Sequence, residues 1–203
     1  DKSLSKRDFR RISNPLSKFG AKFNLTRNKN LPLVITGTSK LKPIKYFENK
    51  GSAQVKSSII FAGMRTEGST VIKAKKSRNH TELLCKYLKI PLTIIKKKKY
   101  DEIKIKKVKN IRTLNYNIPS DISSSAFFIV LTALSKNSEL LIKNVNINPS
   151  RIGVIHILRK MGVKIIFKNL KTYKGEKIAD IKIQSPKKLK SINCPKKFNS
   201  GAI

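Results

Sequence analysis

The sequence predicts an α/β fold that contains a repeated unit. Along its 203 residues, apolar patterns with a helical period alternate with short β-branched runs, which is typical of α/β proteins. A similar junction, in which a helix closes and a strand starts, recurs at residues 18–23, 86–90 and 160–165. A spacing of roughly 70 residues suits one helix-rich supersecondary unit. At the first and third junctions, Gly20 and Gly162 are expected to end the helix in a left-handed conformation.

Periodicity and capping residues place the individual elements. Helices are predicted near residues 7–19, 52–63, 79–89, 121–135 and 150–161. Strands are predicted at residues 33–35, 71–72, 92–95, 103–105, 140–142, 165–167 and 181–183. Ser52 and Ser77 precede two of the helices, and a hydroxyl at such a position can cap free backbone N–H groups. The consecutive lysines at residues 96–99 are expected in a turn or at an exposed strand end.

Composition indicates a soluble globular protein. Hydrophobic residues make up 39% of the chain, no apolar run reaches the roughly 18 residues that cross a bilayer, and no signal peptide opens the chain. The two cysteines, Cys85 and Cys194, have no metal-binding spacing and suggest neither a metal site nor a disulfide framework. We therefore expect a cytoplasmic protein, with Cys85 in the core. Because the chain runs from Asp1, not Met, to Ile203, both ends look cut from a longer protein.

The net charge of +35 raises the possibility of a nucleic-acid partner. Only nine of the 46 basic residues are arginine, however, and the lysines are spread over every segment beside abundant isoleucine and asparagine. An AT-rich coding sequence produces this composition. The sequence also lacks the motifs of an RNA-recognition domain or a zinc finger. We expect no specific nucleic-acid partner, although a basic nucleic-acid-binding module stays open as an alternative.

The two helix openings at Ser52 and Ser77 predict a site for a phosphate or a carboxylate. A helix N-terminus carries a partial positive charge and unpaired N–H donors, which suit anions. Gln54, Lys56 and Arg78 lie in or beside the first turns of these helices and add polar or cationic side chains. Most capped helix starts bind nothing, so the geometry alone is a weak signal.

The residues around these openings resemble the 5-enolpyruvylshikimate-3-phosphate (EPSP) synthase family. Residues 52–57 read Ser-Ala-Gln-Val-Lys-Ser, and residues 77–82 read Ser-Arg-Asn-His-Thr-Glu. Further family motifs are matched at residues 1–7, at residues 118–127 and at Asn-Pro-Ser-Arg, residues 148–151, with its helix ending in Met-Gly. The motifs occur in family order, and the resemblance spans the whole chain.

The resemblance implies a two-domain enolpyruvyl transferase-like architecture, in which each domain holds three βαβαββ units with helix N-termini facing the cleft. Residues 1–117 would be part of the first domain and carry the substrate-binding helix N-termini. Residues 118–203 would be part of the second domain, cut before the catalytic aspartate expected after Ile203. Pro119 supports a crossover at residues 115–119, because it pushes Ile118 out of helical space.

The family transfers the enolpyruvyl group of phosphoenolpyruvate to the 5-hydroxyl of shikimate 3-phosphate, with neither a metal nor an organic cofactor. The resemblance assigns phosphoenolpyruvate binding to Arg7 and Gln54, and shikimate 3-phosphate binding to Ser52, Ala53, Gln54 and Arg78. A guanidinium such as that of Arg7 can bind a carboxylate or phosphate bidentately. No catalytic residue is expected in this chain, so the chain alone should be inactive while its full-length parent, a monomer, is active.

Some residues depart from the family pattern. Asp8 replaces a proline and could offset the field of Arg7, Ser120 replaces a glycine, and Asn79 replaces an aspartate. His80 is interpreted as a hydrogen-bonded structural residue and His156 as a helix-packing residue, not as general bases. The sister enzyme that transfers enolpyruvyl to UDP-N-acetylglucosamine remains an alternative, although the two helix-opening motifs argue against it.

Overall fold

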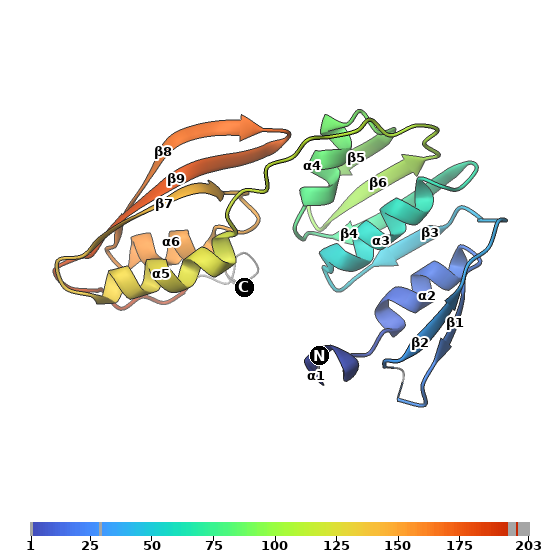
Figure 1. The fold of residues 1–203 in the computed structure, drawn as a ribbon, viewed down its shortest axis with the longest axis horizontal. Helices are drawn as coiled ribbons and strands as arrows, with labels where there is room; N and C mark the ends of the chain where they lie inside the picture. The colour runs from blue at the N-terminus through green and yellow to red at the C-terminus, as the bar shows by residue number, and fades with distance from the viewer. Residues whose placement is uncertain (1, 29, 195–197, 199–203) are drawn as a thin grey trace. The chain divides into compact units, whose positions relative to one another are not determined.

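The computed structural model describes residues 2–28, 30–194 and 198 and separates into two compact units. Unit 1 contains residues 1–77 and 88–112, and unit 2 contains residues 78–87 and 113–203. The chain end at residues 201–203 lies outside the described residues. Figure 1 shows the elements of each unit along the chain.

Unit 1 is built on a mixed four-stranded sheet. Its elements are α1 (Lys2–Ser5), α2 (Arg10–Lys18), β1 (Lys22–Leu25), β2 (Leu33–Thr36), β3 (Lys45–Glu48), α3 (Ala53–Gly63), β4 (Ser69–Lys75), β5 (Leu92–Lys96) and β6 (Tyr100–Lys106). The strand order is β3-β4-β6-β5, with β3 parallel to β4 and the other pairs antiparallel, and β1 and β2 form a separate antiparallel pair. Ile59 and Ile60 of α3, and Ile103 and Ile105 of β6, are fully buried and form part of its core.

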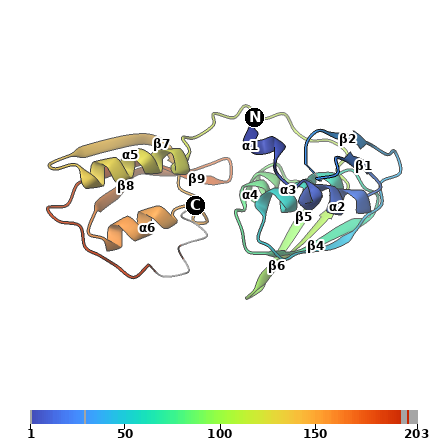
Figure 2. The same ribbon diagram turned by 90° about the horizontal axis from the view of Figure 1, so that it is seen from below.

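Unit 2 is built on a three-stranded antiparallel sheet. Its elements are α4 (His80–Tyr87), α5 (Ile122–Leu134), β7 (Glu139–Asn146), α6 (Gly153–Lys160), β8 (Lys164–Tyr173) and β9 (Glu176–Gln184). The strand order is β7-β9-β8, and a single parallel bridge joins Ser120 to Val145 beside β7. Helices α5 and α6 lie on one face of this sheet (Figures 1 and 2), where Ile129, Ile155 and Ile181 belong to one buried cluster.

The repeated unit is visible in the strand order. The segment β3-α3-β4-α4-β5-β6 is a βαβαββ unit whose strands are ordered β3-β4-β6-β5. The bridge at Ser120 followed by α5-β7-α6-β8-β9 has the same sequence of elements, and its strands have the corresponding order. The segment α2-β1-β2 repeats the second half, a helix followed by an antiparallel strand pair. The predicted α/β fold with repeated βαβαββ units is therefore confirmed.

The predicted junctions are also confirmed. Each of the three segments ends a helix and leads into a strand, and Gly20 and Gly162 have φ of 112° and 95°. At the middle junction Lys89 adopts a φ of 56° without a glycine. The lysines at residues 96–99 lie at the end of β5 and in the turn that follows, as predicted.

Two elements differ from the predictions. The predicted helix at residues 7–19 is shorter, because α2 begins at Arg10 and α1 is a separate turn that ends at Ser5. Arg7 therefore lies between two helices instead of inside one. Strand β3, with the sequence Lys-Tyr-Phe-Glu, was not predicted, since it becomes a strand through its parallel pairing with β4.

Cys85 is buried, as predicted, and burial raises the pKa of its thiol to about 11. Among the described residues, no helix is long and apolar enough to cross a membrane. The domain boundary at residues 117–118 stays a prediction; the two compact units divide between Arg112 and Thr113.

Candidate functional site

The start of α3 is held in place by its own side chains. The Ser52 hydroxyl accepts a hydrogen bond from the backbone N–H of Val55 at 3.3 Å, which is the N-cap predicted for this helix. The buried carboxylate of Glu48 accepts from the N–H groups of Lys50, at 3.0 Å, and Gly51, at 2.8 Å. The loop that leads into the helix is therefore fixed from β3, and the N–H groups of the first turn have a defined direction.

A cavity of about 780 Å³ opens beside this helix start. Its lining residues are Asp8, Arg10, Arg11, Asn14, Tyr46, Glu48, Asn49, Lys50, Ser52 and Val55. Three of them are cations and two are carboxylates, one of which, Glu48, is occupied by backbone N–H groups. The cavity thus combines a helix N-terminus with net positive charge, the combination that favours a small anion.

Gln54 is oriented by an arginine that the sequence did not single out. The Arg11 Nη2 donates to the Gln54 Oε1 at 3.0 Å, across 43 residues of sequence. The carbonyl oxygen of Gln54 is thereby engaged, and the amide keeps its two N–H donors for another acceptor. Arg11 lies next to the family motif in sequence, so position alone could have drawn attention to it, but only the fold shows its partner.

Asp8 binds Arg10. Its carboxylate accepts from the Arg10 backbone N–H at 2.8 Å and from the Arg10 Nε at 2.7 Å, and this pairing raises the pKa of Arg10. The charge of Asp8 is thus paired with Arg10, and its expected effect on the field of Arg7 stays a prediction. Arg7 is exposed, and its backbone N–H donates to the carbonyl of Leu4. It is not among the residues that line the cavity.

The prediction that Ser77 caps the second helix, α4, is wrong. Helix α4 begins at His80, so Asn79 and not Ser77 precedes it. The Ser77 hydroxyl is buried and makes no hydrogen bond within the described part of the chain. Arg78 belongs to unit 2, whereas Ser52, Ala53 and Gln54 belong to unit 1. That these residues act together therefore remains a prediction.

A partly buried polar cluster surrounds the start of α4. His80 Nδ1 lies 2.5 Å from Glu176 Oε1, and Asn148 Nδ2 donates to Glu176 Oε2 at 3.1 Å and to Asn79 Oδ1 at 2.9 Å. Burial works to raise the pKa of Glu176, but the hydrogen bonds and charge of His80 and the Asn148 amide outweigh it, so the pKa is lowered. His80 is a hydrogen-bonded residue, as predicted. Its partner Glu176, 96 residues away, carries no signal in the sequence.

The polar groups at the start of α5 form their hydrogen bonds and ion pairs with one another. Asp121 Oδ2 accepts from the Ser124 N–H at 3.0 Å, and Arg151 Nη2 lies 2.9 Å from Asp121 Oδ1 and 2.5 Å from the Ser123 hydroxyl. Burial opposes ionisation of Asp121, but the Ser124 N–H and the Arg151 charge outweigh it and lower its pKa. Asp121 thus caps the helix, and Arg151 fixes its first turn.

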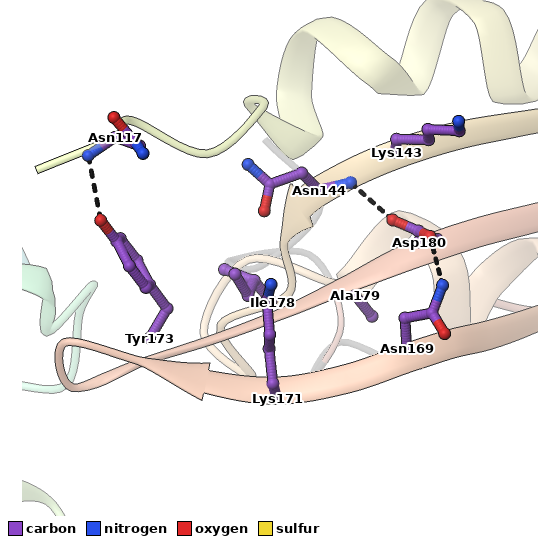
Figure 3. A pocket seen from close by; sticks show the side chains of 9 residues that line it. All are labelled: Asn117, Lys143, Asn144, Asn169, Lys171, Tyr173, Ile178, Ala179 and Asp180. Atoms are coloured by element: carbon purple, nitrogen blue, oxygen red, sulfur yellow. Dashed lines mark hydrogen bonds between the residues drawn. The ribbon is translucent and has the colours of Figure 1, made fainter.

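A second cavity, of about 510 Å³, lies on unit 2 and is shown in Figure 3. Asp180 accepts from the Asn144 N–H at 2.8 Å and from Asn169 Nδ2 at 2.7 Å, and Tyr173 accepts from the Asn117 N–H. Asn144 and Asn169 have left-handed φ values near irregularities in β7 and β8. Asp180 thus joins the irregular segments of β7 and β8, which indicates a structural role for these hydrogen bonds. Among the described residues, no group of His, Cys, Asp and Glu side chains is placed to hold a metal ion.

Comparisons with known proteins agree with this fold. Residues 1–200 match the sequence model of the family described as EPSP synthase (3-phosphoshikimate 1-carboxyvinyltransferase). The 3-phosphoshikimate 1-carboxyvinyltransferase of Hydrogenovibrio crunogenus is 40% identical over 96% of this chain, and that of Legionella pneumophila strain Lens is 42% identical over 96%. In both cases the match covers 44% of the relative, so this chain spans less than half the length of these proteins.

Solved structures give the same result. The structure of EPSP synthase from Acinetobacter baumannii has a TM-score of 0.82 and 36% identity, over 99% of this chain and 45% of that one. The enolpyruvyl transferase NikO from Streptomyces tendae has a TM-score of 0.60 and 14% identity, over 92% of this chain and 44% of that one, and shares the fold.

Proposed function

The chain belongs to the EPSP synthase family, and we propose that the protein containing it transfers the enolpyruvyl group of phosphoenolpyruvate to the 5-hydroxyl of shikimate 3-phosphate, releasing phosphate. In this reaction the methylene carbon gains a proton while the hydroxyl oxygen adds to the neighbouring carbon. Loss of phosphate and of a proton then restores the double bond. We propose no metal and no organic cofactor.

The observation that carries the proposal is the start of α3 beside the cationic cavity. Both substrates are small polyanions, and such ligands need oriented N–H donors and several cations close together. In unit 1 the Ser52 cap, Gln54 held by Arg11, and the charges of Arg11 and Lys50 supply this combination. The residue types alone would have been compatible with a solvated surface.

Each site residue has a distinct proposed role. The Ser52 hydroxyl accepts from Val55 and keeps its own hydrogen for the phosphate of shikimate 3-phosphate, while Ala53 offers only its backbone N–H. The Gln54 amide lies between the two substrates. Arg78 binds shikimate 3-phosphate, and Arg7 binds phosphoenolpyruvate through its guanidinium.

We assign no catalytic residue to this chain. The groups that move the proton are proposed to lie in the part of the longer protein that the chain does not span, so the 203-residue chain alone is inactive. We further propose a monomer in the cytoplasm; among the described residues neither cysteine forms a disulfide, which supports the cytoplasm.

The test is phosphate release by the full-length protein with both substrates. Replacing Gln54 with alanine should lower kcat/KM by roughly 100-fold, because a donor to a charged ligand is lost. Gln184→Ala, a matched change on the surface of unit 2, should leave kcat/KM within twofold. Phosphate release that requires UDP-N-acetylglucosamine instead of shikimate 3-phosphate would establish the sister activity. Turnover by the 203-residue chain at the full-length rate would refute the assignment of the proton-transfer groups to the missing part.

A further inference from the structure

Helix α4 begins on a network of polar side chains that come from three segments of unit 2. Asn79 and His80 lie at the start of the helix, Asn148 lies in the loop between β7 and α6, and Glu176 is the first residue of β9. We name these four residues the α4 anchor. Asn148 and Glu176 are 1% and 5% exposed, so the anchor holds the helix from its buried side.

The Asn148 amide has one orientation. Its Oδ1 accepts from the Ser150 backbone N–H at 2.9 Å and from the Ser150 hydroxyl at 2.7 Å. Its two amide hydrogens therefore face the other way, where Nδ2 lies 2.9 Å from Asn79 Oδ1 and 3.1 Å from Glu176 Oε2. The reverse orientation would place the amide oxygen against the Glu176 carboxylate. The hydrogen bonds thus join the start of α4 to β9 in a defined direction.

The other oxygen of Glu176 holds His80. Oε1 lies 2.5 Å from His80 Nδ1. Burial works to raise the pKa of Glu176, but the hydrogen bonds and charge of His80 and the Asn148 amide outweigh it and lower the pKa. The carboxylate is therefore ionised near neutral pH, and His80 Nδ1 carries the hydrogen.

The middle of α4 lies on the turn that precedes β9. Gly175 in this turn has a φ of 91°, and a Cβ added there would lie 2.9 Å from the Leu83 carbonyl oxygen and 3.5 Å from Tyr87 Cβ. The turn therefore lies directly against the helix. The anchor and this contact together hold α4 at two points along its length.

The anchor fixes the backbone next to Arg78, which directly precedes Asn79. A buried polar network has a desolvation cost that apolar packing would avoid, and it restricts the groups it holds to one position. Here that position is the chain segment from which the Arg78 side chain extends.

We propose that Asn148, Glu176 and His80 are positioning residues, which hold the start of α4 so that Arg78 meets the phosphate of shikimate 3-phosphate. This inference rests on the proposed function, in which Arg78 binds that phosphate. A guanidinium binds a phosphate through parallel N–H···O bonds, and a displacement of about 1 Å weakens such directional contacts.

Calorimetric titration of the full-length protein with shikimate 3-phosphate tests this inference. Glu176→Gln keeps the size of the side chain and removes its charge, so it should weaken binding by about tenfold. Arg78→Ala should weaken binding by about 100-fold. In the double variant, Glu176→Gln should add less than about twofold to the effect of Arg78→Ala, because a positioning residue acts only through the residue that it positions.

Glu139→Gln is the matched control. The Glu139 carboxylate also pairs with β9, through Lys182 and Gln184, but it lies away from the anchor. This change should leave the affinity within about twofold of wild type.

His80 gives a second test, and 34% of its side chain is exposed, so its variants are expected to fold. His80→Ala removes the donor to Glu176 and should weaken binding by about tenfold. His80→Asn places an amide N–H near the position of Nδ1 and should restore the affinity to within about threefold of wild type. Circular dichroism at the titration temperature reports whether each variant is folded.

Each outcome decides the inference. Weakening that disappears in the Arg78→Ala background, with rescue by His80→Asn, supports it. Unchanged affinity in a folded Glu176→Gln or His80→Ala protein overturns it, and so does weakening that adds in full to that of Arg78→Ala. In these cases the proposed function stands, because wild type binds shikimate 3-phosphate and Arg78→Ala weakens the binding. No binding by wild type, or unchanged affinity in Arg78→Ala, would instead overturn the role of Arg78 and the inference with it.

Discussion

Helices α3 and α5 occupy the same place in two repeats of this chain, yet their N-termini have opposite chemistry. Helix α3 is capped by the neutral hydroxyl of Ser52 and opens on a cavity lined by Arg10, Arg11 and Lys50. Helix α5 is capped by the carboxylate of Asp121, which is paired with Arg151. The cap residue of α3 is thus neutral, whereas that of α5 is a carboxylate.

The difference shows that the repeat provides a scaffold and that individual residues provide the site. Both helices present free N–H groups and a partial positive charge at their first turn. In α5 the Asp121 carboxylate already lies at the positive end of the helix, so an external anion would be repelled. In α3 the cap is neutral, and although Arg10 is paired with Asp8, Arg11 and Lys50 also line the cavity, which is the arrangement that the proposed anion site needs. Function therefore depends on the capping residue and its neighbours, not on the fold alone.

Exchanging the caps should have the largest effect. In the full-length protein, Ser52→Asp should weaken binding of shikimate 3-phosphate by roughly 100-fold or more, because a carboxylate repels the phosphate and occupies the helix N-terminus. Calorimetric titration with shikimate 3-phosphate measures this. Aspartate is a good N-cap, so thermal stability should change little, and the reciprocal Asp121→Ser should leave the affinity within twofold. Unchanged affinity in Ser52→Asp would show that the anion does not bind at this helix.

Removing the acidic cap should affect stability instead. Asp121→Ala should lower the free energy of unfolding by about 1–2 kcal/mol, because Ser124 loses its acceptor and the partly buried Arg151 loses its partner. Urea denaturation followed by circular dichroism gives the value. Asp121→Asn keeps a capping oxygen without the charge, so it should lie between wild type and alanine. Equal stability of all three proteins would contradict the role given to this cap.

The ends of the two helices differ in how closely they approach the sheet. A Cβ on Gly63 would lie 2.5 Å from Ile105 Cγ2 and 3.2 Å from Thr70 Cβ, whereas the aligned position in α5 holds Thr132. Gly63→Ala should destabilise the protein by about 1 kcal/mol, the net of overpacking and the better helix propensity of alanine. Urea unfolding compares it with Gly37→Ala, where nothing lies within 4 Å and no loss is expected. A stabilised Gly63→Ala protein would mean that the helix can move away from the sheet.

Acid should lower the free energy of unfolding of unit 2, because its stabilising carboxylates become protonated. The pKa of Glu176 is lowered below its ordinary value of 4.5, so its stabilising contribution is complete above pH 4.5 and is lost as the pH falls through the lowered value. Urea midpoints at pH 7 and pH 3 should differ less in Glu176→Gln than in wild type. The same pH dependence in both proteins would show that the pairing of Glu176 with His80 contributes little. The effect is the smallest of the four, because several carboxylates share it.

The sequence predicted those features that depend on interactions between residues close together in the chain. The Ser52 cap, the apolar runs of α3 and α5, and the glycines that end α2 and α6 act within a few residues of themselves. The family motifs likewise name Ser52, Ala53 and Gln54 in one short stretch. The α/β fold followed from these local signals, and the βαβαββ form of its repeat followed from the family resemblance.

Tertiary structure alone decided which distant groups meet. It paired Arg11 with Gln54 and Glu176 with His80, made a strand of residues 45–48, and left Ser77 without the cap role. It also left the large apolar side chains of Phe127 and Phe128 on α5 exposed. The reason is physical: caps and periodicity act over one or two turns, whereas a hydrogen bond across 43 or 96 residues exists only after the chain has folded.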